Sequence, residues 1–191
     1  MKAGAKSKLR SVTREQLRLL SSKTIKDLSA KICGHLYRSF FSSSTHATLS
    51  FAALANEPDL MPLFEKRVAR QSFCFPRVIG DQLEIRQVTS PSQFIPGYAD
   101  INEPSPQLCP LFPQQDLGII LLPGLAFDPS NGARLGKGKG FYDRLLHQLK
   151  SSRHPLITIG VCFDCQLNHV PEQNHDQRVD AIVTENGMLE F

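Results

Sequence analysis

The chain carries near its middle the stretch LGIILLPGLAFD, residues 117–128. Residues 117–122 are aliphatic or glycine without alternation, a pattern typical of a strand covered on both faces. A second, nearly continuous run of this kind lies at residues 156–161. Such strands indicate a parallel sheet, because the helices that connect parallel strands cover both faces. We therefore expect an α/β fold, a three-layer sandwich with a largely parallel central sheet between helices.

Helical and strand patterns alternate on either side of these two runs. The predicted helices lie at residues 17–40, 60–70 and 141–150, and the predicted strands at 47–54, 73–78, 83–88, 117–122, 156–162 and 181–184. Prolines are frequent in residues 91–113, which predicts an irregular surface loop over the site. A chain of 191 residues, 41% of them hydrophobic, can build its own core, so residues 1–191 are expected to form a single domain.

The first buried run leads into a glycine- and lysine-rich segment, RLGKGKGFYDR, at residues 134–144. Its three alternating glycines let main-chain N–H groups approach an anion without an intervening side chain. Lys137 and Lys139 add positive charge, and a helix beginning near Phe141 would direct its unpaired N–H groups to the same place. Asp143 adds an oxygen ligand of the kind that Mg²⁺ takes beside phosphates. The segment is a candidate site for a nucleoside triphosphate.

The glycines alone leave a second interpretation open, because glycine clusters also form flexible surface turns and the lysines would make such a turn basic. The segment is not a Walker P-loop, since Gly140 and Phe141 follow Lys139 where that motif needs Ser or Thr. It also lacks the Gly-x-Gly-x-x-Gly spacing of a dinucleotide-binding turn. Local sequence therefore indicates phosphate chemistry without a familiar phosphate-binding motif.

Taken together, the motifs of this chain resemble those of the 5-formyltetrahydrofolate cyclo-ligase family, also called methenyltetrahydrofolate synthetases. The segments that carry the resemblance are, in chain order, residues 6–10, 56–57, 102–104, 123–128, 134–143 and 175–185. They extend over nearly the whole chain. Separated motifs in the right order are far more specific than any one of them.

The resemblance implies an ATP- and Mg²⁺-dependent ligase that converts 5-formyltetrahydrofolate to 5,10-methenyltetrahydrofolate with release of ADP and phosphate. The formyl oxygen attacks the γ-phosphate, which turns a poor leaving group into a good one, and the neighbouring folate nitrogen then closes the ring. Such a reaction requires mainly alignment of the two substrates and neutralisation of developing charge.

The resemblance also implies roles for residues of this chain. Lys139 and Arg134 would be catalytic through charge stabilisation, and Asp143 and Asp176 would hold Mg²⁺. The implied ATP-binding residues are Lys6, Lys8, Arg10, Arg134, Leu135, Gly136, Lys137, Gly138, Lys139, Gly140, Phe141 and Tyr142.

Folate binding would fall to Glu57 and Ala52, because a carboxylate such as that of Glu57 can accept two parallel N–H bonds from a pterin ring. Without the resemblance, Glu57 and Asp176 are typical of solvated loop acids. The sequence departs from the family pattern at Phe141, where many members have tyrosine, and after Glu57, where the usual continuation is absent.

Charge and cysteine content fit an enzyme of a reducing compartment. The net charge of +4 suits anionic ligands, and the basic residues before Glu15 lead directly into the helical pattern, so they are expected to begin the folded domain rather than a transit peptide. Five cysteines without a secretory signal argue against a disulfide framework. Cys162 and Cys165 have the spacing of half a zinc site, with His169 and His175 downstream, but no second cysteine pair exists, and Cys162 ends an apolar run where a buried thiol is ordinary.

We expect a cytoplasmic monomer that binds ATP and a small-molecule substrate, with no nucleic-acid or membrane partner, since no apolar run has the length that spans a bilayer. Two other functions stay open. A non-catalytic nucleotide- or nucleic-acid-binding module would keep the basic loop but would not need Asp143, Asp176 and Glu57. A different ATP-dependent kinase or ligase could act on another small acid with the same set of residues.

Overall fold

A computed structural model describes residues 2–41, 46–150, 156–172 and 176–191. These residues form a seven-stranded sheet in the order β11-β10-β9-β6-β1-β2-β3. Its strands are β1 (Ala47–Leu49), β2 (Phe73–Ile79), β3 (Gln82–Val88), β6 (Leu117–Pro123), β9 (Ile157–Val161), β10 (Ala181–Thr184) and β11 (Gly187–Glu190). The strands from β10 to β2 run parallel, whereas β3 and β11 are antiparallel edges. The predicted α/β fold with a largely parallel sheet is confirmed.

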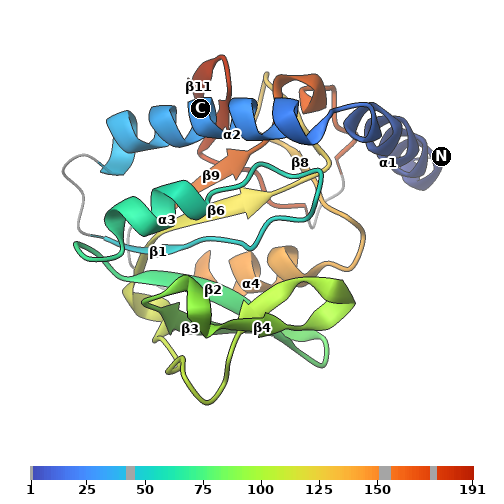
Figure 1. Ribbon diagram of the computed structural model, residues 1–191. Coiled ribbons are helices and arrows are strands. Elements are labelled where there is room, and N and C mark those ends of the chain that lie inside the picture. Colours follow the sequence, from blue (N-terminus) through green and yellow to red (C-terminus); the bar gives the residue numbers. More distant parts are fainter. Residues whose placement is uncertain (1, 42–45, 151–155, 173–175) are drawn as a thin grey trace.

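Helices cover both faces of this sheet (Figure 1). Helices α2 (Ser22–Leu36) and α3 (Met61–Arg67) lie on one face and α4 (Phe141–Lys150) on the other. Helix α1 (Lys2–Arg18) lies beyond the end of the sheet toward which β6 points (Figure 1). In parallel sheets, ligands bind at this carboxyl end of the strands.

Strand β6 explains why the sheet needs cover on both sides. Ile119 and Leu121 belong to a core with residues of α2 and α3, while Ile120 and Leu122 belong to a second core with residues of α4. Each of the four is at most 1% exposed. Successive strand residues point to opposite faces, so an unbroken aliphatic strand can be buried only between two layers.

The N-terminal helix prediction is wrong in its boundaries. Residues 17–40 do not form one helix, because α1 ends at Arg18 and α2 begins at Ser22. Ser21 caps α2, since its Oγ accepts the Thr24 N–H at 3.1 Å, and a serine cap competes with continuation of a helix. After α2, a π-helical turn at Tyr37–Phe41 ends the segment.

Several predicted elements are shorter or differ in kind. The strand predicted at 47–54 ends at Leu49, and the helix predicted at 60–70 covers Met61–Arg67. The segment 91–113, predicted to be irregular, contains an antiparallel hairpin of β4 (Phe94–Pro96) and β5 (Asn102–Pro104). A second small hairpin, β7 (Ala126–Phe127) with β8 (Arg134–Leu135), was not predicted. Short 3₁₀ turns lie at Pro91–Gln93, Tyr98–Asp100, Gln114–Asp116 and Asp164–Gln166.

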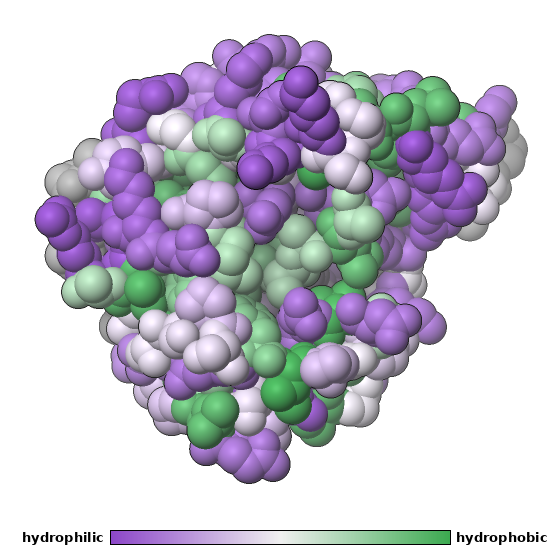
Figure 2. Space-filling model, viewed as in Figure 1, coloured by the Kyte–Doolittle hydropathy of each residue, from purple (hydrophilic) through white to green (hydrophobic). Residues whose placement is uncertain are grey.

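The molecular surface is hollowed in the middle of the face that Figure 2 presents. Apolar side chains gather in this hollow and hydrophilic side chains surround it (Figure 2). Among the described residues, no helix combines the length and the apolar character that crossing a membrane requires.

Candidate active site

The turn between β7 and β8 is fixed to the fold by Asp128, which is 2% exposed. Its carboxylate accepts the Ser130 N–H at 3.0 Å, the Ser130 hydroxyl at 2.6 Å and the Val170 N–H at 3.0 Å, and it contacts His169 Nδ1 at 2.9 Å. Burial by itself would raise the pKa of Asp128, but these hydrogen bonds outweigh burial and lower the pKa. The hairpin that carries Arg134 is therefore firmly anchored.

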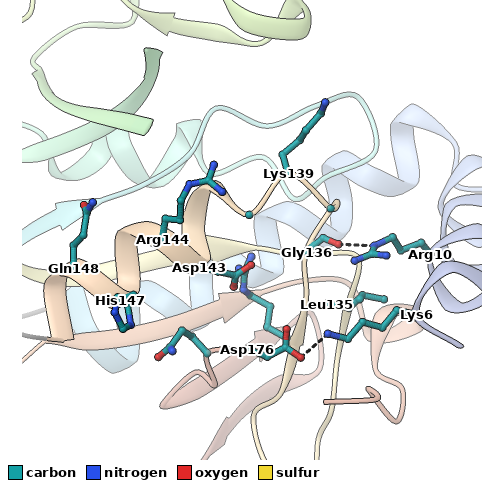
Figure 3. A pocket seen from close by; sticks show the side chains of 14 residues that line it. Lys6, Arg10, Leu135, Gly136, Lys139, Asp143, Arg144, His147, Gln148 and Asp176 are labelled. Atoms are coloured by element: carbon teal, nitrogen blue, oxygen red, sulfur yellow. Dashed lines mark hydrogen bonds and ion pairs between the residues drawn. The ribbon is translucent and has the colours of Figure 1, made fainter. Parts of the chain in front are cut away.

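A basic cleft of about 840 Å³ opens beside this hairpin, between α1, β8 and the beginning of α4 (Figure 3). Arg10 reaches it from α1 and donates from Nε to the Gly136 carbonyl at 3.0 Å. Lys6, 6% exposed, forms an ion pair with Asp176 in which Nζ and Oδ2 are 2.5 Å apart. These contacts tie α1 and the C-terminal segment to the glycine-rich loop.

The backbone of the glycine-rich loop has a conformation that residues with a side chain would adopt only with strain. Gly138 has φ +106° and Gly140 has φ +72°, both in the region that L residues rarely adopt. A Cβ on Gly140 would stand 2.8 Å from a guanidinium nitrogen of Arg144. Both glycines line the basic cleft, so the loop offers main-chain groups at close range there.

Arg134 lines the basic cleft and is 5% exposed. Its Nη1 donates to the Pro123 carbonyl at 3.0 Å, and its Nη2 forms an ion pair with Asp143 Oδ1 at 2.7 Å. Its Nε is buried and has no hydrogen-bond partner among the described residues. A buried N–H without an acceptor is costly, and an anionic oxygen in the cleft would satisfy it.

A second, apolar pocket of about 340 Å³ adjoins the basic cleft. Phe51, Ile101 and Leu83 contribute apolar walls, and the Tyr98 and Phe141 rings, also in the lining, meet edge to face with centroids 5.9 Å apart. The hairpin β4–β5 supplies part of this wall, so the segment 91–113 does lie over the site, as expected. Such a pocket suits a flat ring system that carries a few polar groups.

Glu57 lines the apolar pocket and is 8% exposed, so it is not the solvated loop acid that its local sequence resembles. Its Oε2 accepts the Leu54 N–H at 3.0 Å, and its Oε1 lies 2.5 Å from Lys137 Nζ. Tyr142 is close by: burial raises its pKa, the charge of Glu57 raises it further, and the charge of Arg134 opposes the rise. A buried carboxylate in a largely apolar pocket is a natural acceptor for ring N–H groups, and Glu103 and Asp143 also line this pocket.

The two pockets share one wall. The residues that line both are Arg134, Gly136, Lys139, Gly140 and Asp143. A ligand in the basic cleft and a ligand in the apolar pocket therefore meet at two cations and one carboxylate.

Most of the residues singled out by sequence lie in these pockets. The basic cleft contains Lys6, Arg10, Arg134, Leu135, Gly136, Gly138, Lys139, Gly140, Asp143 and Asp176. Ala52 and Glu57 line the apolar pocket. Lys137, Phe141 and Tyr142, which were expected to contact ATP, line the apolar pocket rather than the basic cleft, and Lys8 is exposed and lines neither.

Sequence reasoning missed several residues of the basic cleft. Arg144, His147 and Gln148 line it from α4 and Gln177 from the C-terminal segment. Helical spacing could have found His147 and Gln148, because they lie three and four residues after Arg144 and so share a helix face with it.

The zinc interpretation gains no support. Within the described ranges, no group of three or more His, Cys, Asp and Glu side chains is arranged to hold a metal ion. Burial raises the pKa of both Cys162 and Cys165, which disfavours the thiolate that binds zinc. His175, which belongs to the C-terminal motif, lies outside the described residues.

The fold is that of methenyltetrahydrofolate synthetases. The NMR structure of the Aquifex aeolicus 5,10-methenyltetrahydrofolate synthetase superposes with a TM-score of 0.83 at 32% identity, covering 97% of this chain and 92% of that one. A Mycoplasma pneumoniae 5,10-methenyltetrahydrofolate synthetase, 21% identical, shares the fold with a TM-score of 0.75 and covers 94% of this chain and 98% of its own.

The family follows from the sequence match. The model of the 5-formyltetrahydrofolate cyclo-ligase family matches residues 2–185, and the chain belongs to this family. It is 33% identical over 100 residues to the 5-formyltetrahydrofolate cyclo-ligase of Saccharomyces cerevisiae, covering 50% of this chain and 45% of the yeast protein. It is 28% identical over 152 residues to that of Escherichia coli, covering 76% of this chain and 81% of the relative. The chain spans about half the length of the first curated relatives it matches, with 45%, 61% and 47% covered.

Proposed function

We propose that this protein is a 5-formyltetrahydrofolate cyclo-ligase that uses ATP and Mg²⁺ to form 5,10-methenyltetrahydrofolate, ADP and phosphate. Family membership supports the proposal, and one observation carries it at the level of chemistry. The basic cleft and the apolar pocket share a wall that contains Arg134, Lys139 and Asp143. A polyphosphate and a pterin placed in the two pockets would meet where positive charge is concentrated.

The basic cleft would bind the triphosphate. Main-chain N–H groups of the glycine-rich loop approach the phosphates, and Lys139 and Arg134 neutralise charge that develops during transfer. The unpartnered Nε of Arg134 would then donate to a phosphate oxygen. Lys6 and Arg10 would hold α1 over the nucleotide through their contacts with Asp176 and the loop.

The apolar pocket would bind the folate ring system, with Glu57 accepting pterin N–H groups and Ala52 in contact with the ring. The formyl oxygen attacks the γ-phosphorus and the bond from that phosphorus to ADP breaks. The neighbouring folate nitrogen then attacks the formyl carbon and loses its proton, and the phosphate leaves with the former formyl oxygen. The protein contributes alignment and charge neutralisation, which are the main requirements of phosphoryl transfer.

Asp143 and Asp176 fit a magnesium ion by their chemistry. Both line the basic cleft, both offer carboxylate oxygens, and Mg²⁺ usually takes one or two carboxylates together with phosphate oxygens. In this structure Asp143 forms an ion pair with Arg134 and Asp176 forms one with Lys6, and these contacts hold the two carboxylates in place. When bound, the ion would neutralise phosphate charge.

A single-domain organisation, a monomeric state and a cytoplasmic location belong to the same proposal, as does the absence of nucleic-acid and membrane partners. The composition of the chain and the small-molecule character of both pockets support these parts of the proposal.

One assay tests the proposed activity. Purified protein with ATP, Mg²⁺ and 5-formyltetrahydrofolate should show the rise in near-ultraviolet absorbance of the methenyl product together with ADP release that depends on the folate. ADP release with other small acids and none with this folate would identify a different kinase or ligase. Salt-sensitive RNA binding without ATP turnover would identify a binding module instead.

A further inference from the structure

Within the loop at residues 136–140, Lys137 lines the apolar pocket but not the basic cleft, whereas its four neighbours all line the basic cleft. Gly136, Gly138 and Lys139 line the basic cleft, whereas Lys137 lines the apolar pocket and a small adjoining cleft of about 190 Å³. Its ammonium nitrogen lies 2.5 Å from Glu57 Oε1. Lys137 belongs to the glycine-rich loop and is thus paired with Glu57 of the apolar pocket.

Both carboxylate oxygens of Glu57 have a partner in this structure. Oε2 accepts the Leu54 N–H, and Oε1 pairs with Lys137. The Glu57 side chain is 9% exposed and the Lys137 side chain 39% exposed. The acid is thus desolvated and requires a partner, while the lysine can leave for water or for another anion at little cost.

We propose that Lys137 is a positioning residue that couples occupancy of the two pockets. This inference rests on the proposed function and deepens it. When ring N–H groups of a ligand in the apolar pocket bind Glu57, the acid no longer requires the ammonium group. Lys137 lies between Gly136 and Gly138, which both line the basic cleft, and its side chain is 39% exposed, so it can turn to that cleft and add a charge for polyphosphate.

Coupling of this kind is reciprocal by thermodynamic linkage. Folate should tighten nucleotide binding, and nucleotide should tighten folate binding by the same factor. The coupling also predicts an unusual effect of replacing Glu57. Although Glu57 lies outside the basic cleft, replacing it with glutamine should release Lys137 and tighten nucleotide binding when no folate is present.

Calorimetric titration of the full chain with a non-hydrolysable ATP analogue and MgCl₂, with and without saturating 5-formyltetrahydrofolate, tests the proposal. In the unmodified protein, folate should lower the Kd of the analogue by about tenfold, within the usual range of couplings. Lys137→Met should abolish this factor and leave the Kd without folate close to that of the unmodified protein. Lys137→Arg should retain part of it.

Glu57→Gln should lower the Kd of the analogue several-fold without folate and leave no further effect of folate. Lys31→Met and Glu65→Gln are matched controls, because both side chains are exposed and line none of the three pockets. A purely structural ion pair would instead weaken nucleotide binding in both Glu57→Gln and Lys137→Met and lower their melting temperatures together.

The outcomes separate this inference from the proposed function. Nucleotide binding that is equally tight with and without folate in the unmodified protein overturns the coupling and leaves the proposed function standing. Coupling that persists in Lys137→Met overturns the role of Lys137. No binding of the analogue by the unmodified protein overturns the proposed function and, with it, the inference.

Discussion

The guanidinium of Arg134 and the carboxylate of Asp143 form an ion pair at 2.7 Å within the wall that the basic cleft and the apolar pocket share. Arg134 belongs to β8 and Asp143 to the first turn of α4, so the pair fixes the beginning of the helix against the hairpin. The side chain of Arg134 is 3% exposed and that of Asp143 is 31% exposed. The cation is therefore held rigidly, while the acid keeps contact with the cleft.

Replacement of Asp143 by alanine should lower turnover by about 100-fold or more, because a ligand to the metal and the partner of a buried guanidinium are both lost. The measurement is the initial rate of methenyl product formation at saturating ATP and Mg²⁺. Asp116→Ala, which changes an exposed acid outside the pockets, is the control and should keep full activity. A normal rate for Asp143→Ala would remove Asp143 from the site.

Lys139→Ala should both weaken ATP binding and slow transfer, because Lys139 lines the shared wall and supplies charge where the phosphate is transferred. Each tenfold loss in rate corresponds to about 1.4 kcal/mol of lost transition-state stabilisation. Steady-state kinetics should show a higher KM for ATP and a lower kcat, with partial recovery in Lys139→Arg. Unchanged KM and kcat would mean that this lysine belongs only to a basic surface turn.

Asp176→Asn should raise the Mg²⁺ concentration needed for half-maximal activity by roughly 10- to 100-fold, the usual consequence of weakening a metal site. The variant keeps the shape of the side chain and loses the charge that pairs with Lys6. Titration of activity with MgCl₂ at fixed ATP measures the effect. The same Mg²⁺ requirement in variant and unmodified protein would exclude Asp176 as a ligand.

Asp128 should make stability depend on pH. Because its pKa is lowered from the ordinary value of 3.8 in the folded protein, its contribution is complete above that ordinary value and is lost as the pH falls through the lower folded pKa. Asp128→Asn should lower the free energy of unfolding at pH 7 by about 1–3 kcal/mol, the cost of hydrogen bonds left poorly made. When urea unfolding is measured from pH 7 down to pH 2, the free energy of unfolding should also fall less steeply with decreasing pH in the variant than in the unmodified protein. Parallel curves for variant and unmodified protein would contradict this role.

Local sequence predicted an element correctly where its residue pattern is compatible with only one kind of packing. The run at 117–122 required helices on both faces, and β6 indeed divides its side chains between two cores. Helix α4 was predicted with its observed bounds, Phe141–Lys150, because the glycines before it cannot continue a helix favourably and the apolar positions after it are spaced for one. The parallel α/β class followed from these elements.

Local sequence failed where long-range contacts decide. Residues 50–54 have a strand-like composition, yet they leave the sheet, and Phe51, Ala52 and Leu54 form a wall of the apolar pocket. The cap at Ser21 ends a helical pattern that hydrophobic spacing alone would continue. The hairpin β4–β5 turns through Ala99 and Asp100 at positive φ, a conformation that no proline or glycine pattern predicts for these residues.

The sequence by itself determined which chemical groups the site contains: glycines that expose backbone, lysines and arginines for phosphate, and acids for metal and ring N–H groups. Only the tertiary structure decided how these groups divide between two pockets, with Lys137 facing Glu57 and Lys139 standing in the shared wall. The reason is physical. The composition of a loop fixes its charge, but the direction of each side chain depends on partners such as Glu57 and Asp176, which lie far away in the chain and reach the loop only when the sheet and helices have assembled.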